Sequence, residues 1–191
     1  FFFDMEANER FAKYCADHNI NTEEYNAPVP RFIRVNPRNG ISEAELRTCF
    51  GSSLRPVAWL PKGFFSLDSN IKIHSSAPYA DARVYGIDAA SAAAVMALAP
   101  ARGDAVLDIC CAPGGKTALI ADILWMYEQF DGCTETPSVV TGVDISVQRL
   151  HTARSIARKY SIDNCRLVLG DGTSWRPWGS TATDQGWWEN E

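Results

Sequence analysis

Three short apolar runs that alternate with helical patterns limit what the second half of this chain can fold into. The runs cover residues 105–110, 139–143 and 165–169. Between them, residues 117–127 and 146–160 place their apolar side chains at helical spacing. Buried strands that alternate with helices are typical of a parallel sheet with helices on its faces. The sequence therefore predicts an α/β fold.

The first half predicts a smaller mixed region. Residues 1–25 show helical spacing, and residues 31–36 form a strand pattern that Pro37 and Asn39-Gly40 close. A second helix is expected to begin at Ser42, because Glu45 completes a capping-box pattern. We therefore predict an α+β region at residues 1–80 and the α/β region at residues 81–191.

Composition and charge exclude several classes of protein. The hydrophobic fraction of 46% is typical of a globular chain. The net charge is −5, so the sequence has no strongly basic domain of the kind that indicates a nucleic-acid partner. The longest stretch without charge or proline, residues 89–99, is too short to cross a bilayer. No signal peptide is visible, and no membrane partner is expected. Because the chain starts at Phe1 without Met and stops abruptly, we expect a piece of a longer protein.

The six cysteines do not form a metal-site or disulfide pattern. None belongs to a C-x-x-C pair, and the three histidines show no ligand spacing, so no metal site is predicted. A chain of this size does not need disulfide staples, so we expect reduced thiols in an intracellular compartment. The cysteines are Cys15, Cys49, Cys110, Cys111, Cys133 and Cys165.

The ends of the three predicted strands carry the candidate site. Ligands of such sheets lie beyond the carboxyl ends of the strands. The first strand runs into a glycine-rich turn that opens a helix, where free amides and Lys116 attract negative charge. Asp144 follows the second strand, in the position of a ribose acceptor, and Asp171 follows the third, where it can meet an adenine amino group. Together they suit a nucleoside with a carboxylate tail, whereas each element alone is more typical of a structural turn or of an aspartate that ends a strand.

Two phosphate-binding motifs fit this turn poorly. A P-loop requires a glycine where Cys110 stands, so Gly115-Lys116-Thr117 is a partial match. A dinucleotide fingerprint requires G-x-G-x-x-G, which Gly114-Gly115 does not supply.

The turn closely resembles a motif of a known family. Residues 108–117, DICCAPGGKT, are similar to the S-adenosylmethionine motif of the Sun/Fmu family of RNA cytosine-5 methyltransferases. Residues 31–36 resemble the strand of that family's small RNA-binding region, and Asp88-Ala89-Ala90-Ser91 resembles the helix start before the motif. The resemblance covers about residues 28–173, and Cys111 departs from the alanine that is usual there.

The resemblance implies a fold and a cofactor site. The expected fold is a Rossmann-like class I methyltransferase sheet, incomplete in this chain, preceded by a small α+β RNA-binding-like region. The implied cofactor is S-adenosylmethionine. Its expected contacts are Cys110, Cys111, Ala112, Pro113, Gly114, Gly115, Lys116, Asp144 and Asp171.

The resemblance also implies methylation of cytosine carbon 5 in RNA, with ribosomal RNA as the expected substrate and with ribosomal subunits or assembly factors as partners. In that family a cysteine thiolate attacks carbon 6 and a second cysteine assists release, and both follow later strands. None of the six cysteines matches those positions, so no catalytic residue is assigned and this segment alone is not expected to be active. A nucleolar or a mitochondrial location fits equally. The alternative is a catalytically inactive scaffold in ribosome assembly.

RNA contacts are predicted for the small region. Arg31, Arg34 and Arg38 cluster there and fit phosphate binding. Arg154, Arg158 and Lys159 share a predicted helix, where a solvated charged face explains them at least as well.

Overall fold

The computed structural model describes residues 5–21, 28–131 and 137–176. The chain divides into two compact units, Phe1–Pro30 and Arg31–Glu191. In the first unit the described helix is α1 (Met5–Asp17). The helix expected to reach residue 25 is therefore shorter. Asn19 follows it with a φ of 53°, a left-handed conformation that asparagine tolerates and that ends helices.

A small antiparallel sheet opens the second unit, in the spatial order β2-β3-β1-β4. Its strands are β1 (Arg31–Val35), β2 (Arg55–Pro56), β3 (Phe64–Leu67) and β4 (Val84–Gly86). β1 lies between β3 and β4, with Ile33 opposite both Phe65 and Gly86. The strand predicted at residues 31–36 is thus confirmed. The boundary predicted at residue 80 stays a prediction, and β4 joins this sheet from beyond it.

Short helical segments cover one face of the small sheet. They are α2 (Glu43–Phe50), η2 (Gly51–Ser53), η3 (Ile73–Ser75) and α3 (Ala77–Ala80). The predicted capping box is confirmed, because the Ser42 hydroxyl accepts from the Glu45 amide while the Glu45 carboxylate accepts from the Ser42 amide. Leu46 of α2 packs with Ile33 and Leu67 of the sheet in one apolar cluster.

The second sheet is parallel, as predicted, with the order β5-β6-β7. Its strands are β5 (Ala105–Asp108), β6 (Val139–Asp144) and β7 (Cys165–Leu169). The helices associated with it are α4 (Ala89–Leu98), α5 (Gly115–Asp131) and α6 (Val147–Lys159). Asp88 and Ser146 cap α4 and α6 through their side chains. In the part of the chain described above, no helix has the length and apolar character needed to cross a membrane.

β5 differs from the buried strand that its sequence predicts. Leu107 in β5 is 46% exposed, whereas Val140 and Val143 in β6 are fully buried. Among the described residues β5 pairs with β6 alone, so its other edge is open. An apolar strand at the edge of a sheet keeps part of its surface exposed, whereas β6 is enclosed between two neighbours.

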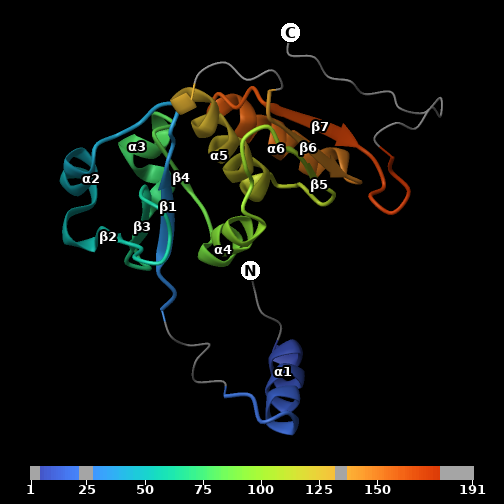
Figure 1. The fold of residues 1–191 in the computed structure, drawn as a ribbon. Coiled ribbons are helices and arrows are strands. Elements are labelled where there is room, and N and C mark those ends of the chain that lie inside the picture. The colour runs from blue at the N-terminus through green and yellow to red at the C-terminus, as the bar shows by residue number, and fades with distance from the viewer. Residues whose placement is uncertain (1–4, 22–27, 132–136, 177–191) are drawn as a thin grey trace. The chain divides into compact units, whose positions relative to one another are not determined.

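One apolar core joins the two sheets. It includes Phe64 and Tyr85 of the small sheet, Val95 of α4, Leu119 of α5 and Val140 of the parallel sheet. Figure 1 shows α4 and α5 between the small sheet and the parallel sheet. The helix that begins at the glycine-rich turn, α5, therefore packs on both sheets.

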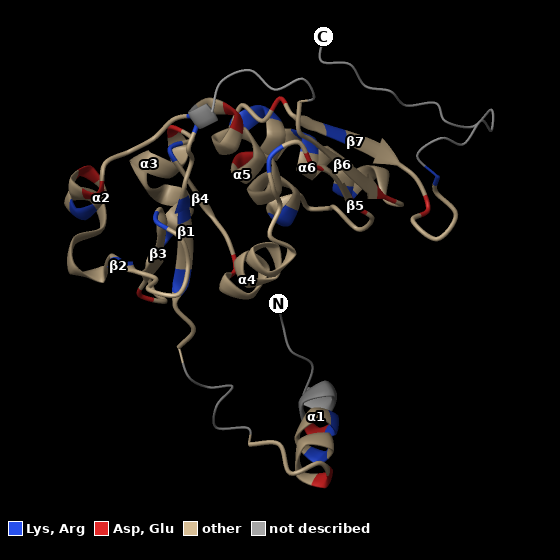
Figure 2. Cartoon of the chain, in the orientation of Figure 1, with Lys and Arg blue, Asp and Glu red and all other residues tan. Residues whose placement is uncertain are grey.

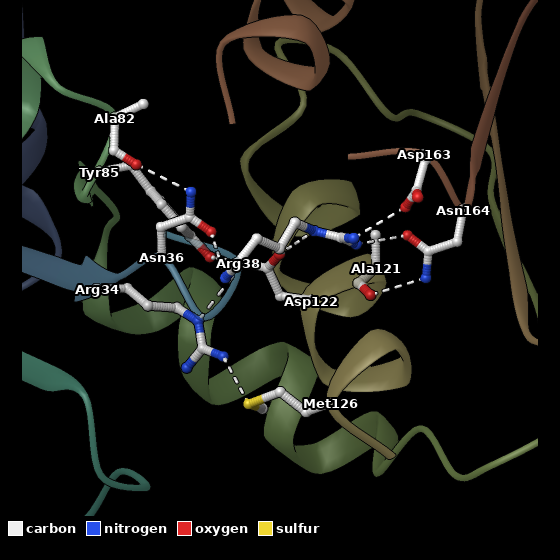
Figure 3. A network of polar contacts seen from close by, with 10 residues as sticks. All are labelled: Arg34, Asn36, Arg38, Ala82, Tyr85, Ala121, Asp122, Met126, Asp163 and Asn164. Atoms are coloured by element: carbon white, nitrogen blue, oxygen red, sulfur yellow. Dashed lines mark hydrogen bonds and ion pairs between the residues drawn. The ribbon is translucent and has the colours of Figure 1, made fainter. Parts of the chain in front are cut away.

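A buried carboxylate on α5 faces the small sheet inside this core. Asp122 is 1% exposed and accepts a hydrogen bond from the Tyr85 hydroxyl at 2.9 Å. The Nε of Arg38 lies 3.3 Å from one of its oxygens, and the Nε of Arg34 lies 3.8 Å from the other (Figure 3). Burial raises the pKa of Asp122, and the two guanidinium groups oppose that shift. Arg34 and Arg38 thus supply the countercharge that a buried carboxylate needs.

Arg38 extends the network toward the parallel sheet. Its terminal nitrogens donate to Asp163 at 2.8 Å and to Asn164 at 2.7 Å, just before β7 (Figure 3). The Asn164 side chain in turn donates to the carbonyl of Ala121 on α5. One arginine that follows β1 therefore links the small sheet, α5 and the start of β7.

The first prediction concerns this network. We expect Asp122→Asn to lower the free energy of unfolding by about 3–5 kcal/mol, because it leaves Arg34 and Arg38 buried without their shared countercharge. Asp163→Asn is the matched control, since it also removes a carboxylate from Arg38 but at a position 75% exposed. It should cost less than about 1 kcal/mol. Urea unfolding measures both, and equal losses would contradict the role of Asp122.

The second prediction concerns Gly142 in β6. A Cβ at this position would lie 2.8 Å from Cβ and 2.9 Å from Sγ of Cys111, and 2.9 Å from Leu167. We expect Gly142→Ala to destabilise the protein by about 1–3 kcal/mol, because β6 and the turn after β5 must separate to admit a methyl group. An added Cβ at Gly115 meets no atom within 4 Å, so Gly115→Ala should change stability by less than about 0.5 kcal/mol. Equal melting temperatures for Gly142→Ala and the parent chain would refute this account.

Candidate functional site

The glycine-rich turn lies between β5 and α5, and its two glycines serve different needs. Gly114 has a φ of +110°, and a Cβ there would lie 3.2 Å from Ala153 of α6. A side chain at Gly114 would therefore push α6 away from the turn. Gly115 begins α5 and has open space where its Cβ would be. The start of α5 is thus open, and helix starts favour negatively charged groups.

Asp108 and Thr117 hold the turn closed. The Thr117 hydroxyl donates to Asp108 at 2.7 Å, and the Cys110 amide donates to the other oxygen of the same carboxylate at 3.3 Å. Asp108 is the first residue of the motif at residues 108–117, but the sequence analysis did not assign it to the site. The available signal was its position, because Asp108 ends β5 just as Asp144 ends β6.

Asp144 ties the end of β6 to the turn. Its carboxylate is 3% exposed and accepts from the amides of Ala112 at 3.2 Å and Ser146 at 3.0 Å. Arg149 of α6 lies with Nη1 3.6 Å from Asp144 and donates through Nη2 to the carbonyl of Ala112. Arg149 is a second residue that the sequence interpretation missed, and its position three residues after the helix cap Ser146 was the available signal.

Asp171 lies in the loop after β7 and faces solvent. Thr173 donates to its Oδ1 through both its amide, at 2.9 Å, and its hydroxyl, at 2.7 Å. These bonds hold the pKa of Asp171 below its usual value, so the carboxylate is charged at neutral pH. A Cβ on Gly172 would lie 2.9 Å from the Ile109 carbonyl, so this loop passes close to the turn after β5. The three strand ends therefore gather at one edge of the sheet.

Two thiols near the turn, those of Cys111 and Cys165, are poor nucleophiles. Burial, and then the carboxylates of Asp108 and Asp144, raise the pKa of Cys111 to about 12. Burial likewise raises the pKa of Cys165 to about 12. Both thiols are protonated at neutral pH, whereas a nucleophile must be a thiolate. Cys111 instead packs against Gly142.

The remaining cysteines add no metal site. Cys15, Cys49, Cys110, Cys111 and Cys165 are free thiols, and Cys133 lies outside the described residues. Within the described part of the chain, no group of three or more histidine, cysteine or acidic residues is placed to hold a metal ion.

The three arginines predicted to contact RNA have different surroundings. The side chains of Arg34 and Arg38 are 4% and 6% exposed and point into the network around Asp122. The Arg34 guanidinium also lies 4.8 Å from the centre of the Phe64 ring. Arg31 is exposed at the start of β1 and donates to the carbonyl of Ser69 at 3.3 Å. RNA contact stays a prediction for all three. The guanidinium groups of Arg34 and Arg38 are enclosed, whereas Arg31 is exposed.

Comparisons with known proteins agree with this geometry. Residues 95–185 match the family described as 16S rRNA methyltransferase RsmB/F. The chain is 27% identical over 155 residues to the human 28S rRNA (cytosine(4447)-C(5))-methyltransferase, covering 78% of this chain and 18% of that protein. It is 28% identical over 173 residues to ribosomal RNA small subunit methyltransferase B of Vibrio cholerae, covering 88% of this chain and 34% of that protein. The chain thus spans a minor part of these relatives' length.

Solved structures show the same fold. A methyltransferase homologue from Pyrococcus horikoshii superposes with a TM-score of 0.62 at 27% identity, covering 78% of this chain and 46% of that one. NSun6 from Pyrococcus horikoshii, solved with the S-adenosylmethionine analogue SFG, gives a TM-score of 0.65 at 14% identity, covering 82% and 62%. The Rossmann-like methyltransferase fold predicted from the sequence is confirmed. With the matched segment and the named relatives, these findings confirm the resemblance of this chain to the Sun/Fmu family of RNA cytosine-5 methyltransferases.

Proposed function

We propose that this chain forms the S-adenosylmethionine-binding part of an enzyme that methylates carbon 5 of cytosine in RNA, with ribosomal RNA as the substrate. The observation that carries the proposal is the convergence of Asp144, Asp171 and the open start of α5 at one edge of the parallel sheet. The relatives named as ribosomal RNA methyltransferases support the substrate class.

The residues present fit the cofactor group by group. The carboxylate of its methionine tail suits the start of α5 beside Lys116, where helix amides and a cation meet. Its ribose hydroxyls suit Asp144, because two backbone amides occupy only part of the acceptor capacity of a carboxylate. Its adenine amino group suits Asp171. Both bonds from Thr173 go to Oδ1, and no described residue donates to Oδ2.

The cofactor would supply an electrophilic methyl group, and this chain's residues would hold it. Asp144 and Asp171 would fix its nucleoside end, while the packing of Gly114 on Ala153 keeps the turn in place. The thiolate that activates cytosine is not assigned to this chain, because the family's catalytic positions are unmatched and Cys111 and Cys165 are protonated. We therefore assign the cysteine chemistry to the whole protein.

The alternative of a catalytically inactive scaffold gains no support, since the relatives are named as enzymes. Binding to a ribosomal subunit or to assembly factors remains part of the proposal. The cellular location would depend on the ribosome whose RNA is methylated. It would be nucleolar for a cytosolic ribosome and mitochondrial for an organellar one.

The third prediction tests the cofactor site by isothermal titration calorimetry. We expect the chain to bind S-adenosylmethionine, and Asp171→Asn to weaken binding about tenfold, because a charged acceptor becomes a neutral one. Asp171 is the sharper choice, since replacing buried Asp144 would also release the amides of Ala112 and Ser146. Asp163→Asn, an exposed carboxylate before the amino end of β7, is the control and should bind like the parent. Binding of ATP without S-adenosylmethionine would overturn the proposal.

The fourth prediction tests the reaction of the whole protein. We expect its depletion to abolish methylation at one cytosine, with ribosomal RNA as the substrate, as read by bisulfite sequencing of ribosomal and transfer RNA. The cofactor's methyl group would no longer reach that base. Unchanged methylation together with defective ribosome assembly would favour the scaffold.

A further inference from the structure

An indole ring packs at the end of β7, beside the loop that carries Asp171. A Cβ at Gly170 would lie 3.1 Å from Cδ1 of Trp175 and 3.3 Å from Cγ1 of Val143. Because Gly170 has no side chain, the ring of Trp175 can occupy the space beside the end of the strand. Trp175 is partly buried there, and the cofactor contacts proposed above do not include it.

The ring of Trp175 lies on the side of the parallel sheet that faces away from α5. In β6, Val140 packs in the core with Leu119 of α5. Val143 follows three residues later in the same strand, so its side chain points to the opposite face of the sheet. Val143 is nevertheless fully buried. Trp175, which packs beside Val143 at the end of β7, therefore shields apolar surface on this second face.

Backbone hydrogen bonds close the loop that runs from Gly170 to Trp175. The amides of Ser174 and Trp175 donate to the carbonyl of Asp171 at 3.0 Å and 2.8 Å. At the start of the loop, the amide of Gly170 donates to the carbonyl of Asp144 at 3.1 Å. Figure 2 shows the loop beyond the end of β7, with its acidic residue in red. The loop is thus tied to β6 at one end and held by an indole at the other.

We propose that Trp175 is a positioning residue for the contact between Asp171 and the adenine amino group of the cofactor. The Asp171 carboxylate faces solvent, and the donors that hold it belong to Thr173 of the same loop. Its position therefore depends on how the loop itself is anchored. The indole anchors the loop before the ligand arrives, so less ordering is needed on binding. This inference rests on the proposed function, since it concerns the adenine end of the same site.

The test compares two ligands by isothermal titration calorimetry with the full chain. One is S-adenosylhomocysteine, and the other is its analogue in which hydrogen replaces the adenine amino group. The parent chain should bind the analogue about tenfold more weakly, because Asp171 then accepts no hydrogen bond from the base. We expect Trp175→Ala to weaken binding of S-adenosylhomocysteine about fivefold, the effect of a loop that must be ordered on binding. The affinity for the analogue should not change.

Two further variants serve as controls. Trp175→Phe should keep most of the preference for the amino group, because a phenyl ring can still pack at Gly170. Trp59→Ala is the matched control, since Trp59 is also a tryptophan outside the parallel sheet and is 62% exposed. It should bind both ligands like the parent chain.

A second route displaces the indole without removing it. The backbone of Gly170 does not have a positive φ, so a side chain is allowed there, but its Cβ would press on the ring of Trp175. Gly170→Val should therefore weaken binding of S-adenosylhomocysteine severalfold and spare the analogue. In the double variant with Trp175→Ala the ring is absent, so the valine should add little further loss.

The outcomes keep the two proposals apart. An unchanged preference for the amino group in Trp175→Ala and Gly170→Val overturns the role of Trp175 alone. Equal weakening of both ligands by Trp175→Ala also overturns it, because the residue then supports the fold rather than the Asp171 contact. A parent chain that binds both ligands equally overturns it as well, since Asp171 then makes no contact with the amino group. A parent chain that binds neither ligand overturns the cofactor proposal itself.

Discussion

The buried carboxylate of Asp122 is the constraint on which the arrangement of the two sheets depends. A charge with 1% exposure is tolerated only where opposite charges and hydrogen bonds surround it, and Arg34, Arg38 and Tyr85 provide these from the small sheet and the loop that follows β1. Asp122 lies two helical turns after Gly115, the first residue of α5. The contact that fixes the small sheet on α5 therefore also fixes the start of α5, where the cofactor tail is proposed to bind.

Local signals predicted most elements, because their causes lie within a few residues. The capping box of Ser42 and Glu45 and the cap at Ser146 mark helix starts that the structure confirms. The three parallel strands follow from apolar runs between helices. The exposure of β5 did not follow, since an apolar run does not show whether a strand has one neighbour or two. The early end of α1 depends on the backbone of Asn19, which apolar spacing does not encode.

Part of the candidate site could be predicted from the sequence for a related reason. Parallel strands end at the same edge, so chain order alone brings Asp144 and Asp171 to the glycine-rich turn. The surroundings of Arg34 and Arg38 could not be predicted from the sequence, because their partner Asp122 lies more than 80 positions away on α5. Arginines in a strand can face solvent or a neighbouring helix, and only tertiary packing distinguishes the two. The buried carboxylate of Asp122 explains the inward direction of these two side chains.

The local charge therefore differs from one part of the chain to another, and the net charge conceals this difference. Carboxylates gather at the strand ends, where Asp144 and Asp171 suit the hydroxyl and amino donors of a nucleoside whose sulfonium is itself positive. Arg47, Arg55 and Arg83 pair with neighbouring acids, so these three arginines add no net positive charge to the small sheet and its helices. The net charge of −5 therefore does not describe the local charge at either sheet, and it is compatible with the RNA substrate that we propose for the whole protein.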